Sequence, residues 1–290
     1  MGTTWSARIV DAPADSRDAI DQTLAGVIAQ MSNWEPDSDI SRFNSSAIGQ
    51  WVPLPPDMMT VLQAGLHVAR LSSGAFDPAV GRIVERWGFG PSGVTELVSA
   101  LTHSSPWTTI EVDGDKARRM ADVTLDFSGI AKGFAVDAVA RRLRDLGATS
   151  FLIEIGGELR GQSVKPDGQP WWVDAEAPPG LSLPTLRVAL YGLSIATSGD
   201  YRRFREEGGR RLSHSIDPMT GCPIANDVAS VTVLHDSAML ADAWATAITV
   251  LGHERGMALA TRQGLAARLI RREGSGGLEY MTPALAAMLD

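Results

Sequence analysis

Cysteine is almost absent from this sequence, because Cys222 is the only one among 290 residues. A single cysteine excludes an intramolecular disulfide and any zinc site built from two or four cysteines. A chain of this length buries roughly three quarters of its unfolded surface, so it needs no such support to fold. We interpret Cys222 as a small, half-buried residue.

Positively charged residues are also fewer than negatively charged ones. Lys and Arg number 26 against 34 Asp and Glu, which gives a formal net charge of −8. This balance argues against broad electrostatic binding to nucleic acid or to an anionic membrane surface. Hydrophobic residues make up 44% of the chain and charged residues 21%, a composition that is ordinary for a globular protein and excludes wholesale disorder.

Long apolar runs are missing as well. None approaches the roughly 20 residues that a membrane-spanning helix needs, so we expect no transmembrane segment. Residues 1–8 lack the charged region, apolar core and cleavage site of a secretory leader, and no lipid-attachment cysteine is present. We therefore expect a cytoplasmic protein as the sequence stands, or an exported one if a leader has been removed.

Several common enzyme motifs are absent. The sequence contains no Walker loop, no Gly-x-Ser-x-Gly motif and no His-x-x-x-His pair, which removes support for P-loop, serine-hydrolase and zinc-hydrolase functions. Residues 88–93 match the Gly-x-Gly-x-x-Gly fingerprint of dinucleotide-binding proteins. However, they follow an expected helix instead of a strand, and Pro91 falls inside the motif, so we expect no nicotinamide-binding Rossmann site.

The hydrophobic pattern predicts helices and strands without a regular alternation between them. Helical spacing predicts helices over 15–31, 55–72, 79–87, 129–146, 237–251, 253–263 and from Pro283 onward, whereas 32–56 reads as irregular. A period of two predicts strands over 150–155, 171–176, 185–191, 212–216, 228–235 and 265–271, with a hairpin at 113–115. This mixture indicates an α+β fold with mixed or antiparallel sheets, and the absence of a linker favours one domain over residues 1–290.

Two polar segments lie beside strong apolar elements in the first half of the chain. Residues 74–78 form a small-residue turn that permits close backbone approach, with Phe76 as a stacking surface. The alternative is a tight turn in which Asp77 caps a helix. Asp126 precedes the helix at 129–146, whose free N–H groups attract anions, and Lys132 adds positive charge. The alternative is an ordinary capped helix with Lys132 in solvent.

Two further polar segments follow in the second half. Residues 197–201 read as a turn, and the next predicted strand carries His214 and leads to Asp217. His214 is a candidate base, although a lone histidine in a strand is more often structural. Asp242 and Thr246 lie four positions apart, so both oxygens project from one helix face and suit Mg²⁺. The alternative is that Asp242 accepts a hydrogen bond within the core.

Taken together and in order, these segments resemble the ApbE family, the FAD:protein FMN transferases. The resemblance runs along nearly the whole chain, through residues 1–3, 34–44, 74–78, 87–90, 126–137, 155–157, 197–201, 213–218 and 241–246. It implies a single α+β domain of the T-fold-like ApbE type that binds FAD and Mg²⁺. The implied reaction transfers FMN from FAD to a threonine of an acceptor redox protein, through a phosphoester, and releases AMP.

The resemblance also implies which residues form the site. FAD contacts would fall on Met1, Trp34, Ala75, Phe76, Asp77, Asp126, Lys132 and Ile216. Mg²⁺ would be held by the side chains of Asp242 and Thr246 and by backbone oxygens of Gly129 and Ala245. Some members of the family carry an acid in place of Lys132 or Ala245, so the metal shell here has fewer side-chain oxygens, and Lys132 can serve as a phosphate-binding charge.

We expect catalysis to depend on Asp242 through the metal, and on His214 as a general base oriented by Asp217 or Asp200. Two alternatives stay open at this point. Water could replace the threonine, which would make the protein an Mg-dependent FAD pyrophosphatase. Alternatively, the protein could bind FAD without turning it over.

Overall fold

The computed structural model describes residues 2–93, 106–201, 204–207, 210–274 and 276–289. The chain forms two compact units that are interleaved in sequence. The first consists of Gly26–Ala131 and Arg203–Ala225, and the second of Gly2–Ala25, Lys132–Arg202 and Asn226–Asp290. Helix α1 (Ser16–Met31) contributes residues to both units. The prediction of a single domain over residues 1–290 stays a prediction.

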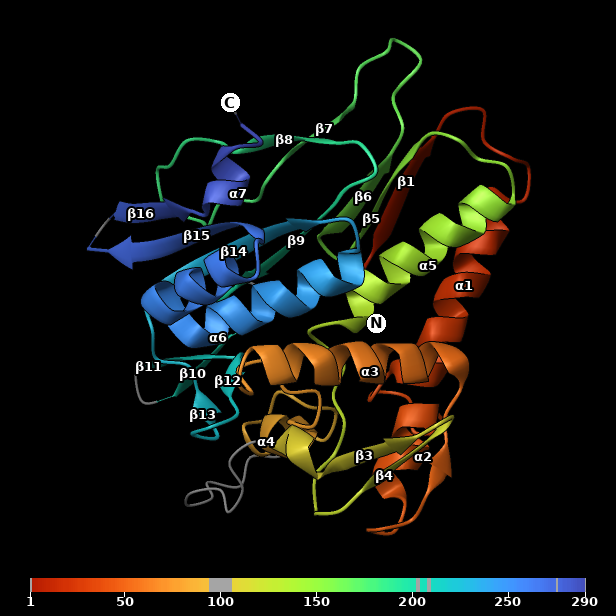
Figure 1. Cartoon of the computed structure of the whole chain (residues 1–290), viewed down its shortest axis with the longest axis vertical. Coiled ribbons are helices and arrows are strands. Elements are labelled where there is room, and N and C mark those ends of the chain that lie inside the picture. The colour runs from red at the N-terminus through yellow and green to blue at the C-terminus, as the bar shows by residue number, and fades with distance from the viewer. Residues whose placement is uncertain (1, 94–105, 202–203, 208–209, 275, 290) are drawn as a thin grey trace. The chain divides into compact units, whose positions relative to one another are not determined.

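The second unit is built around a seven-stranded sheet (Figure 1). Its strands, in spatial order, are β1 (Trp5–Ile9), β5 (Phe151–Ile155), β6 (Glu158–Gln162), β9 (Ser194–Gly199), β14 (Val228–His235), β15 (Ala266–Glu273) and β16 (Gly276–Met281). Every neighbouring pair is antiparallel. Strand β5 alternates buried and half-buried residues, whereas β14 is buried along almost its whole length. Strand β14 is therefore covered on both faces.

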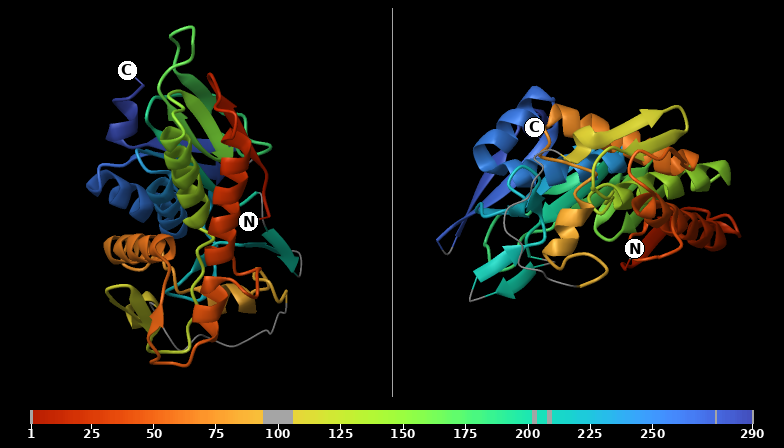
Figure 2. Two further views of the ribbon diagram at one scale, coloured as in Figure 1. Left: turned by 90° about the vertical axis from the view of Figure 1, so that its right-hand side faces the viewer. Right: turned by 90° about the horizontal axis from the view of Figure 1, so that it is seen from below.

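Helix α6 (Ala238–Arg262) packs against this sheet, where it contacts β9, β14 and β15. The sequence predicts a break between residues 251 and 253, and the structure confirms it, because the helix is kinked at Gly252, which has φ 78°. Glycine adopts a positive φ without steric cost. Helix α5 (Ala131–Asp145), helix α7 (Pro283–Ala286) and the hairpin of β7 (Trp171–Asp174) and β8 (Arg187–Leu190) belong to the same unit (Figure 2).

The first unit combines short helices with a small antiparallel sheet. Its helices are α2 (Asp39–Ser45), α3 (Pro56–Leu71), α4 (Gly81–Arg86) and the 3-10 helix Pro106–Thr109. The sheet has the order β2 (Val52–Pro53), β4 (Lys116–Arg119) and β3 (Ile110–Asp113), and two-stranded ribbons pair β10 (Phe204–Glu207) with β11 (Arg210–Ser213) and β12 (Ile216–Asp217) with β13 (Cys222–Pro223). The predicted hairpin at 113–115 is confirmed, and Gly114 has φ 58° in its turn.

Two predicted segments are wrong because polar side chains form local hydrogen bonds there. The predicted strand over 212–216 is broken at His214, since Oγ of Ser213 accepts the N–H of Ser215 at 3.1 Å and closes a bend. The irregular segment 32–56 contains helix α2, whose first turn is capped by Ser38 accepting the N–H of Ser41. A helix of seven residues is too short for its apolar spacing to stand out in the sequence.

The predicted turn at 197–201 is also wrong over most of its length. Residues 197–199 belong to β9 and pair with β14. Oγ1 of Thr197 lies 2.9 Å from Oγ1 of Thr232, so the hydroxyl is part of a cross-strand pair. Cys222 is exposed instead of half-buried, since β13 is a two-residue strand at an exposed position.

The antiparallel sheets, with helices placed irregularly between their strands in the sequence, confirm the predicted α+β class. No helix in the described part of the chain has the length and apolar character needed to cross a membrane.

Candidate active site

A pocket lies in the first unit between α2, α4 and residues 124–128. Its volume is about 210 Å³, below the roughly 300–1,000 Å³ of pockets that hold whole drug-sized ligands. Trp34, Asn33, Asn44, Phe89, Asp126 and Ser128 are among the residues that line it. The pocket therefore has room for one ring or polar group of a larger ligand, beside the aromatic side chains of Trp34 and Phe89.

Two asparagines hold the wall of this pocket in place. Asn44 donates to the carbonyl of Leu125 at 3.0 Å and accepts its N–H at 2.7 Å, and Asn33 donates to the same carbonyl at 3.2 Å. These bonds fix the backbone next to Asp126, whose Oδ1 accepts the N–H of Ser128 at 2.7 Å. Oδ1 of Asn33 is buried and has no hydrogen-bond partner among the described residues. Asp126 thus brings a carboxylate to the wall of the pocket.

The turn at 74–78 combines glycine geometry with a buried acid. Gly74 has φ 83°, and Ala75 and Phe76 are buried, so the ring of Phe76 has no open face in this structure. Oδ1 of Asp77 accepts the N–H of Ala79 at 2.7 Å, and Oδ2 accepts the N–H of Trp107 at 3.1 Å. The carboxylate therefore joins the turn to the 3-10 helix, while its predicted contact with FAD stays a prediction.

Burial raises the pKa of Asp77 from 3.8 to about 7, although its two backbone N–H partners oppose the rise. The folded protein therefore holds this proton more tightly than the unfolded chain between about pH 4 and pH 7. The stability that Asp77 contributes is fully present below about pH 4 and is lost as the pH rises through about 7. A shift of this size corresponds to roughly 4 kcal/mol.

We expect Asp77→Asn to flatten the pH dependence of stability, because a neutral amide has no proton to lose. Urea midpoints measured from pH 4 to pH 7 should fall less steeply for the variant than for the wild type. Parallel slopes for the two proteins would contradict the raised pKa of Asp77.

His214 lies on the bend between β11 and β12. Its ring centroid is 6.5 Å from that of Phe89, in an edge contact at 71°. Because Phe89 lines the pocket, His214 lies beside the pocket in the first unit. Ile216 follows in β12 and is buried.

The two acids predicted to orient His214 have other partners in the structure. Oδ1 of Asp217 accepts the N–H of Met219 at 2.9 Å and so shapes the turn after β12. Asp200, in the second unit, forms a two-pronged ion pair with Arg272 at 2.5 and 2.9 Å. The orientation of His214 by either acid stays a prediction.

Lys132 lies near the start of α5, between two carboxylates of the second unit. Its Nζ is 2.6 Å from Oε1 of Glu158 and 3.5 Å from Oδ1 of Asp242, whose Oδ2 accepts the N–H of Gly133 at 3.1 Å. Burial lowers the pKa of Lys132, but the charges of Asp242 and Glu158 outweigh it and raise that pKa above its usual value. Burial raises the pKa of Glu158, while the charge of Lys132 opposes the rise. The ammonium is therefore held charged inside an acidic cluster.

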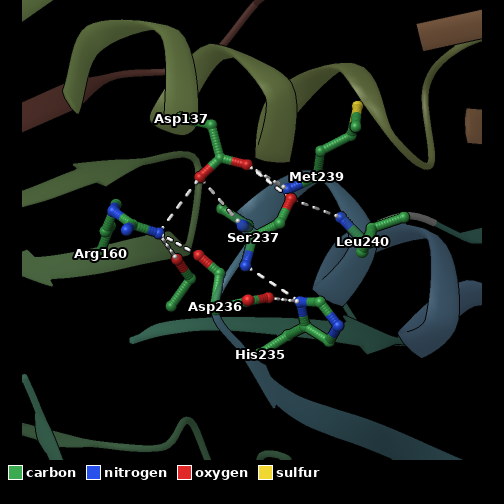
Figure 3. A network of polar contacts seen from close by, with 9 residues as sticks. Asp137, Arg160, His235, Asp236, Ser237, Met239 and Leu240 are labelled. Carbon is green, nitrogen blue, oxygen red and sulfur yellow. Dashed lines mark hydrogen bonds and ion pairs between the residues drawn. The ribbon is translucent and has the colours of Figure 1, made fainter. Parts of the chain in front are cut away.

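Asp137 of α5 holds the first turn of α6 (Figure 3). Its Oδ1 accepts the N–H of Ala238 at 3.0 Å, and its Oδ2 accepts the N–H of Met239 at 3.1 Å and the hydroxyl of Ser237 at 2.8 Å. A helix leaves these first N–H groups without partners of its own, so a carboxylate at this end is strongly stabilising. Asp242 lies about one turn further along α6.

The residues predicted to bind Mg²⁺ divide between the two units. Asp242, Ala245 and Thr246 lie on α6 in the second unit, whereas Gly129 belongs to the first. Among the described residues, no three His, Cys, Asp or Glu side chains gather into a metal-binding group. The backbone oxygen of Ala245 already accepts the hydroxyl of Thr249 at 2.8 Å. Its role as a ligand therefore stays a prediction, as do those of the other three.

The donor set nevertheless fits a hard cation. Oδ1 of Asp242 is 3.5 Å from Nζ of Lys132, which is longer than the roughly 2.7–3.2 Å that is usual for an N–H···O hydrogen bond. The hydroxyl of Thr246, one helical turn later, is half-buried. Mg²⁺ is typically bound by one or two carboxylates and completed by waters and substrate phosphates, which is the kind of shell these residues would supply.

The predicted FAD contacts are likewise distributed over both units. Trp34 and Asp126 line the pocket of the first unit, where Ala75, Phe76, Asp77 and Ile216 are buried, and Lys132 belongs to the second unit. Met1 lies outside the described residues.

Comparison with known proteins decides the family. The sequence model of the ApbE family matches residues 1–269, which is most of the chain. The chain belongs to the ApbE family. An FAD:protein FMN transferase of Vibrio cholerae is 37% identical and aligns with 100% of this chain and 90% of its own length. Another, from Escherichia coli K12, is 33% identical and aligns with 100% of this chain and 87% of its own length.

A solved ApbE structure agrees with the fold. The crystal structure of the Pseudomonas stutzeri flavinyl transferase ApbE, in its apo form, superposes with a TM-score of 0.91 at 38% identity, covering 99% of this chain and 94% of that one. These matches confirm the family resemblance, the α+β fold and the prediction that the chain is an enzyme.

Three polar side chains near the candidate site border the ApbE segments but were not predicted as site residues. Asn44 ends the segment 34–44, Asp137 ends the segment 126–137, and Glu158 directly follows the segment 155–157. Each makes a contact with a residue distant in sequence, which spacing alone does not reveal. The sequence feature that could have identified them is their position at the end of, or directly after, a segment that resembles the ApbE family.

Proposed function

We propose that this ApbE-family chain is an FAD:protein FMN transferase that attaches FMN to a threonine of an acceptor redox protein with Mg²⁺ and releases AMP. The observation that carries the proposal is full-length similarity to proteins named FAD:protein FMN transferase, at 37% identity for the Vibrio cholerae relative. The carboxylate of Asp242 is buried beside Lys132 and could bind a divalent cation. Such a cation would offset the two negative charges on the pyrophosphate of FAD.

The proposed reaction is a displacement at phosphorus. The threonine oxygen forms a bond to the FMN-side phosphorus of FAD, and the bond from that phosphorus to the bridging oxygen breaks, so AMP leaves with the electron pair. The hydroxyl proton passes to His214 on the bend before β12, three residues before Asp217 in the chain. Phosphoryl transfer of this kind depends more on positioning and charge neutralisation than on covalent help from the enzyme.

The chain's own residues would bind and orient the reactants. Trp34 and Asp126 would hold one ring system of FAD in the pocket of the first unit, with Ala75, Phe76, Asp77 and Ile216 supporting the surrounding turns. Lys132 would add positive charge for the phosphates at the start of α5. Asp242 and Thr246, with backbone oxygens of Gly129 and Ala245, would hold Mg²⁺, which when bound neutralises charge on the pyrophosphate.

Mass spectrometry of an acceptor protein tests the proposal directly. After incubation with FAD and Mg²⁺, a threonine-containing acceptor should gain the mass of one FMN phosphoester. A parallel reaction without acceptor separates the alternatives. Rapid AMP release there would indicate an FAD pyrophosphatase, and bound FAD that stays intact in both reactions would indicate a flavin-binding protein without turnover.

We expect His214→Ala to slow FMN transfer by about 10²- to 10⁴-fold and to leave a measurable rate, because general-base assistance has that typical size. The rate is measured at saturating FAD and Mg²⁺. His67→Ala is the matched control, because His67 is exposed on α3. If the two variants react equally fast, His214 is not the base.

A further inference from the structure

In the cluster of Lys132, Glu158 and Asp242, the ammonium of Lys132 lies closer to the carboxylate of Glu158 than to that of Asp242. Nζ of Lys132 is within hydrogen-bond distance of Glu158, at 2.6 Å, but 3.5 Å from Oδ1 of Asp242. We propose that Glu158 is a positioning residue that holds the Lys132 ammonium away from Asp242, so that Oδ1 of Asp242 stays available to a divalent cation. This inference rests on the proposed function, in which Asp242 is a metal ligand.

The burial of Glu158 has no evident purpose in folding. Its side chain is 2% exposed, and its Oε2 has no hydrogen-bond partner in the described part of the chain. Most buried polar atoms have such a partner. Replacing a buried ion pair with apolar residues of similar volume is often neutral or stabilising. If Glu158 positions Lys132, this role explains why a buried acid occupies a site where an apolar side chain would be enough for folding.

The aliphatic part of the Lys132 side chain packs beside Gly156, although the side chain is 30% exposed. A Cβ added to Gly156 would lie 3.3 Å from Cδ of Lys132 and 2.8 Å from Oγ1 of Thr3, which shows that the stem passes directly beside this glycine. Among the described residues, the acids within ion-pair distance of Nζ are Glu158 and Asp242. When Glu158 is removed, Asp242 is the remaining partner.

The distance between Lys132 and Asp242 also matters for a cation that would bind Asp242. If Lys132 instead donated directly to Asp242, the metal would have to displace that hydrogen bond. Residues behind a metal ligand typically change metal affinity by about 10- to 100-fold when mutated.

Titration with Mn²⁺ alone, followed by electron paramagnetic resonance of the free ion, tests this role on the full chain without FAD or acceptor. We expect Glu158→Gln to weaken Mn²⁺ binding by about 10- to 100-fold. Glu158→Asp should also weaken it, because the shorter side chain keeps its charge but cannot reach Nζ at the 2.6 Å seen here. Glu154→Gln is the matched control, since Glu154 lies on the adjacent strand β5, bonds the Gly157 N–H at 2.8 Å, and its amide replacement can still accept that bond.

Three results with the variants, and a fourth with the wild type, would overturn the inference. Unchanged binding by Glu158→Gln would show that Glu158 does not influence the metal. Wild-type binding by Glu158→Asp together with weak binding by Glu158→Gln would show that only net charge matters. An equal loss in Glu154→Gln would show a general effect of removing an acid from this hairpin. If the wild type binds no Mn²⁺ at all, the metal site of the proposed function fails, and this inference fails with it.

A double variant keeps the test decisive if Glu158→Gln folds poorly. Glu158→Gln with Lys132→Met removes both members of the ion pair, together with the ammonium that lies 3.5 Å from Asp242. With no ammonium to compete for Asp242, we expect its Mn²⁺ affinity to return to within about twofold of the wild type. Binding that stays as weak as in a folded Glu158→Gln or Glu158→Asp protein would identify some cause other than Lys132.

Discussion

Asp242→Asn is expected to remove nearly all FMN transfer, with a loss of at least about 10²- to 10³-fold, the range typical of losing one group that stabilises charge in the transition state. The amide can still accept the N–H of Gly133, which the carboxylate accepts at 3.1 Å, so α5 and α6 should keep their contact. What the variant loses is the negative charge that would bind a divalent cation. The measurement is the rate of FMN attachment to acceptor at saturating FAD and Mg²⁺.

The control for this prediction lies on the same helix. Glu254 is an exposed acid of α6, and Glu254→Gln removes one negative charge from that helix without touching the cluster. Its transfer rate should match that of the wild type. Full activity in Asp242→Asn would refute the assignment of Asp242 as a metal ligand, and a similar loss in both variants would point to net charge as the cause.

Gly133→Ala is expected to destabilise the second unit strongly. A Cβ at this position would lie 2.1 Å from the backbone oxygen of Ala238 and 2.7 Å from Cα of Met239. These are backbone atoms of the first turn of α6, so no side-chain rotation can relieve the overlap. Overpacking usually costs about 1–3 kcal/mol, and we expect at least the upper value here because the backbone itself must move. Urea unfolding should show a clearly lower midpoint.

Gly26→Ala provides the contrasting case. Gly26 lies in α1, where an added Cβ would meet nothing within 4 Å. Alanine is favoured over glycine inside a helix by about 0.5–1 kcal/mol, so this variant should be as stable as the wild type or slightly more stable. An unchanged midpoint for Gly133→Ala would contradict the close approach of α5 and α6.

The longer helices were largely predictable from the sequence because their signals are local, whereas four strands of the seven-stranded sheet, β1, β6, β9 and β16, were not predicted. The spacing of Ile130, Phe134 and Val139 predicts α5, and Gly252 separates two helical patterns at the place where α6 is kinked. Segments rich in polar residues were predicted less well, because polar residues are common both in turns and in strands. Thr197 reads as a turn residue, but its hydroxyl pairs with Thr232 across two strands, and a cross-strand partner is invisible to a pattern of nearby residues.

The candidate site was predictable only in part. The resemblance singled out Asp242 and Lys132, but Glu158, the second acid beside Lys132, is 26 residues from Lys132 in the chain. The carboxylate of Asp137 caps a helix that begins about 100 residues later. Backbone oxygens such as that of Gly129 carry no residue-type signal at all. Contacts of this kind arise from tertiary packing, so a sequence can name the chemistry of a site more readily than the residues that position it.

The most direct test of the account is the stoichiometry of AMP and FMN in one reaction. Wild-type protein, FAD, Mg²⁺ and an acceptor should yield one AMP for each FMN found on an acceptor threonine, and chelation of the metal should stop both products. AMP formed in excess of attached FMN, or attachment that continues without a divalent cation, would contradict metal-dependent transfer to an alcohol.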